Sequence, residues 1–109
     1  MDSHDISLIR EFRRRLPPDI ARRLRGVKVF GSRSRGSAEP DSDLDVLVLV
    51  DSWDTELEKE IEDAAYQAMW DDDFRVILSI KVFAEEEFLD LARRGWSFFC
   101  AVQREGISV

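Results

Sequence analysis

The sequence predicts a small α/β or α+β domain built from three strands and four or five helices. Short apolar runs of strand length alternate with longer segments whose apolar residues recur at helical spacing. Residues 46–50 are apolar at every position, which is typical of a central strand covered on both faces. A chain of 109 residues has the usual length of one domain, so we expect a single domain over residues 1–109.

The N-terminal third is expected to hold two helices and the first strand. Apolar residues at helical spacing predict a helix over residues 5–16, which ends at two prolines that cannot continue it. A second, short helix is predicted over residues 19–25, with Gly26 as its left-handed cap. Residues 27–30, with the sequence Val-Lys-Val-Phe, form the first predicted strand.

The same signals predict the remaining elements. A second strand is expected over residues 43–50 and a third over residues 74–83. Between them, a Thr-x-x-Glu capping box predicts the start of a helix over residues 55–70. Two helices follow the third strand, over residues 84–94 and 97–106; a glycine closes the first and a serine caps the second.

Composition narrows the class of protein. The net charge of −7 argues against general binding to nucleic acid, although ten of the sixteen basic residues lie between Arg10 and Arg35. That positive region could face a phosphate-bearing ligand or an acidic partner; for the arginines before Gly26, a solvated helix face is the simpler interpretation. One cysteine, Cys100, fits a cytoplasmic protein, and a single His4 leaves no usual zinc site. No apolar run is long enough to cross a membrane.

The main motif joins the first two predicted strands. It consists of glycine, serine and aspartate residues in strand–turn–strand order: Gly31, Ser32, Gly36, Ser42, Asp43 and Asp45. Residues two apart on a strand share a face, so Asp43 and Asp45 project together. Two such carboxylates repel each other unless a cation lies between them, and oxygen ligands suit Mg²⁺.

The turn before these acids has the features of a phosphate site. Gly31 lets the backbone pass close to a bulky anion, and Ser32 offers a hydroxyl donor beside free backbone N–H groups. The simpler alternative is a glycine-rich surface turn before a core strand. The combination of all these residues in one order favours the binding site.

The segment from Gly31 to Asp45 resembles the motif of the DNA polymerase beta-like nucleotidyltransferases. Because the chain is small, it resembles most the minimal nucleotidyltransferase (MNT) branch of that family, and the resemblance extends to residues 85–88 and 105–107. It implies a mixed sheet flanked by helices, and a domain that transfers a nucleoside monophosphate from a nucleoside triphosphate to a hydroxyl.

The resemblance also implies roles for individual residues. Asp43 and Asp45 would be catalytic and would hold one or two Mg²⁺ ions on ATP, the expected substrate. The implied nucleotide-binding residues are Gly31, Ser32, Arg33, Arg35, Gly36 and Ser42. Among these, the guanidinium groups would offset the charge of the leaving pyrophosphate.

One departure from the family pattern concerns a third carboxylate on a later strand. Its expected position is Ser79, whose neighbours on the same face are Ile77 and Lys81, and the predicted third strand carries no acid. A hydroxyl binds metal far more weakly than a carboxylate, and Lys81 would repel a cation. Catalysis is then weak, or Asp41 or Asp51 assists, or the domain binds nucleotide without turning it over; Asp51 lies too far along its strand to be a good candidate.

Three functions remain open from the sequence. In the first, the chain is the MNT antitoxin that modifies a HEPN-domain toxin with AMP, as the resemblance implies. In the second, it neutralises such a partner by contact alone, without chemistry. Transfer to an aminoglycoside is a third, weaker alternative, because no segment of this chain resembles a drug-binding half. The oligomeric state is open, and a homo-oligomer is among the possibilities.

Overall fold

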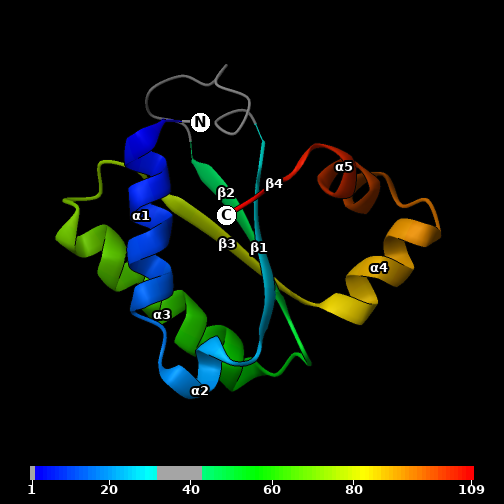
Figure 1. The fold of residues 1–109 in the computed structure, drawn as a ribbon, viewed down its shortest axis with the longest axis horizontal. Helices are drawn as coiled ribbons and strands as arrows, with labels where there is room; N and C mark the ends of the chain where they lie inside the picture. Colours follow the sequence, from blue (N-terminus) through cyan, green and yellow to red (C-terminus); the bar gives the residue numbers. More distant parts are fainter. Residues whose placement is uncertain (1, 32–42) are drawn as a thin grey trace.

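The computed structural model describes residues 2–31 and 43–109. Its centre is a four-stranded mixed sheet in the order β3-β2-β1-β4 (Figure 1). The strands are β1 (Leu24–Phe30), β2 (Leu44–Val50), β3 (Leu78–Ala84) and β4 (Ile107–Ser108). Strand β1 runs antiparallel to both β2 and β4, whereas β2 and β3 are parallel. The expected mixed sheet flanked by helices is therefore confirmed.

Five helices surround the sheet in the described residues. They are α1 (Ser3–Arg14), α2 (Pro18–Ala21), α3 (Thr55–Asp71), α4 (Glu85–Arg93) and α5 (Ser97–Glu105). Helices α1 and α3 lie on one side of the sheet and α4 and α5 on the other (Figure 1). Parallel strands need a crossover connection, and α3 provides it between β2 and β3.

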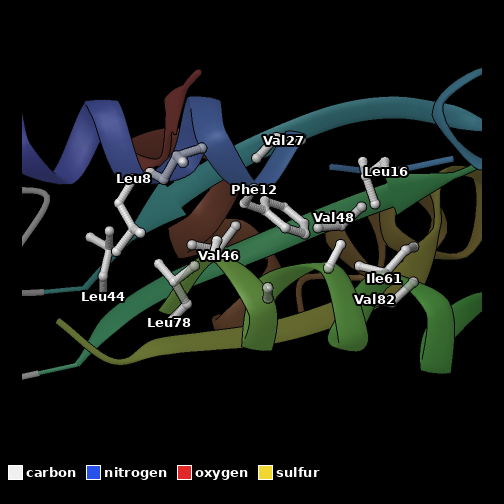
Figure 2. Packing of buried hydrophobic residues seen from close by; sticks show 14 of the residues in the cluster. Leu8, Phe12, Leu16, Val27, Leu44, Val46, Val48, Ile61, Leu78 and Val82 are labelled. Carbon is white, nitrogen blue, oxygen red and sulfur yellow. The ribbon is translucent and has the colours of Figure 1, made fainter. Parts of the chain in front are cut away.

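The larger hydrophobic cluster lies between the sheet and helices α1 and α3. Figure 2 shows Phe12 of α1, Val46 of β2 and Ile61 of α3 within it, and all three are fully buried. Burial of a large apolar side chain contributes roughly 1.5–3 kcal/mol. This cluster holds β2 against the two helices.

A smaller cluster covers the opposite face of β2. Leu47 and Leu49 pack there with Phe88 of α4 and with Phe99 and Val102 of α5. The strand is therefore buried on both faces, as its unbroken apolar run predicted. A central strand of this kind has room for charge only at its ends.

The first strand begins earlier than predicted. Leu24 already pairs with Val50, and a register shift separates it from Gly26, which pairs with Leu49. The prediction of a left-handed cap at Gly26 is wrong, because this glycine lies inside β1, and α2 ends at Ala21. Partial burial of Leu24 against the core outweighs the local signal for a longer helix.

The start of α3 also differs in detail. Asp54, not Thr55, is the N-cap, and its side chain accepts a hydrogen bond of 2.8 Å from the Leu57 N–H. The aspartate carboxylate adds a favourable charge at the positive end of the helix. Similarly, Ser97 is the first residue of α5 and follows the N-cap Trp96, so the predicted serine cap is wrong.

The third strand is shorter than predicted at its start. Asp73 and Phe74 have positive φ values of 57° and 51°, so the chain turns sharply after α3 and becomes a strand only at Leu78. A fourth strand was not predicted. The two residues of β4 pair with Lys28 and Val29, and so short a strand has no periodic signal in the sequence.

No helix within residues 2–31 and 43–109 has the length and apolar character that crossing a membrane requires.

Burial predicts which leucines stabilise the fold. Leu57, at 1% exposure, fills the core under α3, whereas Leu89 on α4 is 37% exposed. We expect Leu57→Ala to lower the free energy of unfolding by about 2–5 kcal/mol because it leaves a cavity. The matched Leu89→Ala variant should cost less than about 1 kcal/mol. Urea denaturation followed by circular dichroism measures both, and equal losses would contradict this packing.

Candidate functional site

The two predicted acids lie at the start of β2. Asp45 is the second residue of that strand and Asp43 directly precedes it. In the ladder with β1, Asp45 pairs with Phe30, so Gly31 follows immediately beside it. Five other predicted nucleotide-binding residues lie outside the described residues: Ser32, Arg33, Arg35, Gly36 and Ser42.

Gly31 and Asp45 are in close contact. A methyl group on the Gly31 Cα would lie 2.5 Å from Asp45 Oδ2 and 3.4 Å from its Cγ. The backbone of Gly31 also has a φ of +84°, a conformation that side chains other than hydrogen rarely adopt. The backbone angle therefore favours glycine, and a larger residue would also have to displace the Asp45 carboxylate.

The Asp45 carboxyl lies in an unfavourable electrostatic environment for its charge. Partial burial raises the pKa of this group, the Lys81 ammonium lowers it, and repulsion from the Asp43 carboxylate raises it further. The net direction is upward, so the ionised form is destabilised. The Asp45 carboxylate and the neighbouring Asp43 carboxylate together are a suitable donor set for a hard cation such as Mg²⁺.

The position next to Asp45 on β3 carries a hydroxyl. Asp45 pairs with Ser79 in the parallel ladder, which is where the sequence placed the missing third acid. Ile77, two residues before Ser79, is exposed. In residues 2–31 and 43–109, no group of three or more His, Cys, Asp or Glu side chains is placed to hold a metal ion.

The alternative acids do not complete the site in the described residues. Asp51 follows the far end of β2 and forms an ion pair of 3.0 Å with Arg23. Its pKa is lowered by hydrogen bonds from Ser52 and Arg23, although partial desolvation opposes this. Asp51 thus has a structural role, and Asp41 lies outside the described residues.

Two lysines lie on the same sheet face as Asp45, one row further along. Leu47 pairs with Lys28 on β1 and with Lys81 on β3. Residues two apart on a strand share a face, so this row lies about 7 Å behind the Asp45 row. Lys28 was not predicted as a site residue. Side chains along residues 27–30 alternate between the two faces of the sheet, so Lys28 could have been assigned to the Asp45 face, but only if the pairing of β1 with β2 had been known.

A solved structure described as the crystal structure of a toxin-antitoxin with AMP-PNP resembles this fold. The TM-score is 0.57 at 22% sequence identity, over 94% of this chain and 69% of that chain. Such a likeness concerns the fold. A search of curated proteins finds no match to the sequence.

A family-level comparison covers most of the molecule. The profile described as a nucleotidyltransferase domain matches residues 6–94, which include most of α1, Gly31, both acids and the whole of β3. Together with the mixed sheet and the placement of Gly31 against Asp45, this match gives the family: the chain is a member of the nucleotidyltransferase domain family.

Proposed function

We propose that this chain is a Mg²⁺-dependent nucleotidyltransferase that transfers AMP from ATP to a hydroxyl of a partner protein. The contact between Gly31 and Asp45 is the main support, because it sets a turn without side-chain bulk directly beside the acidic pair. Membership of the nucleotidyltransferase domain family supports the reaction class.

Each residue has a defined task in this proposal. Asp43 and Asp45 would hold Mg²⁺ on the triphosphate, and the ion would supply positive charge that polarises the phosphoryl oxygens. Gly31 and Ser32 bind the β- and γ-phosphates through backbone N–H groups and the serine hydroxyl. The remaining loop residues, Arg33, Arg35, Gly36 and Ser42, complete the nucleotide site, with the guanidinium groups toward pyrophosphate.

The reaction is a displacement at the α-phosphate. The acceptor oxygen bonds to the α-phosphorus, the bond to the β-phosphate oxygen breaks, and pyrophosphate leaves; the hydroxyl proton passes to water. The protein contributes positioning and charge stabilisation. Lys28 and Lys81, one row behind Asp45, are placed to attract the phosphates.

We further infer that the acceptor belongs to a HEPN-domain toxin, which the chain would neutralise as its antitoxin. The resemblance to the MNT branch supports this partner, and the solved structure with the similar fold is itself described as a toxin-antitoxin with AMP-PNP. The net charge of −7 is more compatible with a protein acceptor than with nucleic acid.

A second function follows from Ser79. A site with two carboxylates, a neutral hydroxyl and the Lys81 ammonium holds a cation less firmly than one with three carboxylates. In this alternative the chain binds nucleotide or partner, and neutralisation works by contact alone.

Nucleotide binding can be tested by thermal stability. With Mg²⁺ and AMP-PNP at tenfold excess over Kd, linkage predicts about 1.4 kcal/mol of stabilisation and a Tm increase of about 5 °C. Asp45→Asn should abolish this increase because it removes one charge from the cation site. The unliganded variant should melt no lower than the wild type, since the carboxylate it replaces is destabilised.

The matched control is Asp51→Asn, at the other end of the same strand. It removes the ion pair with Arg23 and should keep the full ligand-dependent shift. Gly31→Ala should lose the shift although it leaves both acids in the sequence, because its methyl group would displace the Asp45 carboxylate. No shift in the wild type at millimolar ligand would contradict both nucleotide functions.

Transfer can be tested with ATP labelled at the α-phosphate, Mg²⁺ and a HEPN-domain protein as the proposed acceptor. We expect label on a partner hydroxyl, and at least a hundredfold loss in Asp43→Ala and Asp45→Ala because each removes a metal ligand. Neutralisation that persists in both variants, without label, would instead establish the contact mechanism.

Position 79 offers a gain-of-function test. Ser79→Asp places a third carboxylate in register with Asp45. If two acids limit metal binding, the variant should saturate at about tenfold lower Mg²⁺ in the transfer or thermal-shift assay. Ser79→Asn, of similar size and without charge, is the control. An unchanged Mg²⁺ requirement in Ser79→Asp would show that the site does not need a third acid.

A further inference from the structure

The outer edge of β3 is an unpaired strand edge. Leu44 donates a backbone hydrogen bond of 2.8 Å to the Ile77 carbonyl, which therefore faces β2. Backbone groups of successive strand residues face alternate sides, so those of Leu78, Ile80 and Val82 face away from the sheet. The Leu78 N–H meets Met69 Sδ at 3.1 Å. Within the described residues, no hydrogen bond uses the outward groups of Ile80 and Val82.

Helix α3 forms a wall beside this edge. Glu58, Glu62, Tyr66 and Met69 recur at intervals of three or four residues and so lie along one stripe of the helix. A hollow of about 370 Å³ lies between this stripe and β3, with Glu62, Tyr66 and Met69 on the helix side. A second hollow continues past Ile80 toward Glu58 and Trp53. Together they form a groove along the strand, which we call the β3 groove.

Aromatic side chains stand at one end of the β3 groove. Tyr66, Trp70 and Phe74 are 53%, 62% and 36% exposed, and their ring centroids lie 5.6–6.3 Å apart. Phe74 reaches this cluster through a backbone with positive φ, which costs a bulky residue about 1 kcal/mol or more. Three exposed aromatic rings, two from α3 and one held by a strained turn, indicate a binding surface.

The charge of the β3 groove indicates what it binds. Its hollows are lined by the acids Glu58, Glu62, Asp63 and Glu87, against one base, Lys81. In the part of the chain that the structure describes, Glu62 and Asp63 form no ion pair. A ligand with regularly spaced positive charge would neutralise this row.

A second copy of the chain is a poor occupant. Two-fold antiparallel pairing of β3, whose middle residue is Lys81, would place this lysine opposite itself. The rows of Glu58 and Glu62 would also approach their own copies, on chains that each carry a net charge of −7. Like charges placed opposite each other destabilise strand pairing.

We propose that the β3 groove binds an extended, basic segment of a partner protein, which adds to the sheet as a fifth strand beside β3. The segment's backbone would pair with Ile80 and Val82, and its lysines or arginines would face Glu58 and Glu62. The proposal does not depend on nucleotidyl transfer, because Ile80 and Asp45 project from opposite faces of the sheet.

The test uses the whole chain and the capped peptide Lys-Val-Lys-Val-Lys-Val-Lys as the probe. With peptide at tenfold excess over Kd, hydrogen exchange at the Ile80 and Val82 amides, followed by NMR, should slow about tenfold. The peptide Glu-Val-Glu-Val-Glu-Val-Glu should have no effect. Protection spread over the whole surface, or equal effects of both peptides, would overturn the proposal.

A matched pair of variants tests the role of charge. Glu58→Gln with Glu62→Gln removes two charges facing the β3 groove, and we expect the basic peptide to bind about three- to tenfold more weakly. Glu56→Gln with Glu60→Gln removes two charges from the same helix, about 200° around it, and should not change binding. Equal effects of the two pairs would overturn the proposal.

One further outcome is decisive. Protection of Ile80 and Val82 that rises with protein concentration, without peptide, would show that a second copy occupies the β3 groove. Because the peptide assay contains no nucleotide, failure of the Mg²⁺ and AMP-PNP shift leaves its result unaffected. Circular dichroism melts confirm that each Gln variant is folded before its binding is compared.

Discussion

The pairing register between β1 and β2 is the constraint on which the site depends. Phe30 lies opposite Asp45, so the next residue, Gly31, lies so close to the carboxylate that a methyl group on its Cα would displace it. A slip of one residue would turn Asp45 into the core and expose its apolar neighbours. Burial of β2 on both faces prevents that slip, so the hydrophobic core itself positions the acidic pair.

The same burial determines the electrostatics of the acids. Strand β2 is covered over most of its length, and Asp45 lies near the end of that cover, where it is only partly desolvated. A cation would relieve the cost of its charge and the repulsion from Asp43. Ser79 beside it contributes no charge, and Lys81 supplies one positive charge that is part of the protein. Whether two carboxylates beside Lys81 hold the cation firmly enough decides between a catalytic and a binding function.

The two surfaces that we propose as functional lie at different places on one sheet. Asp45 and Ser79 project toward the side of α4 and α5, whereas the β3 groove opens along the outer edge of β3, mainly toward α3, and Lys81 borders both surfaces. Strand β3 contributes to both, because alternate residues face alternate sides. A partner bound along its outer edge would therefore lie one strand away from the acidic pair without covering it.

The sequence by itself determined the fold class, the central position of β2 and the pairing of a glycine turn with two acids, because these depend on local periodicity and motif spacing. Placement of Ser79 beside Asp45 also followed from the sequence, and the parallel ladder agrees. Only the tertiary structure decided that Leu24 begins β1, that β4 exists, and that Lys28 joins the Asp45 face. Those features arise from pairing between distant segments, whose energy no local pattern contains.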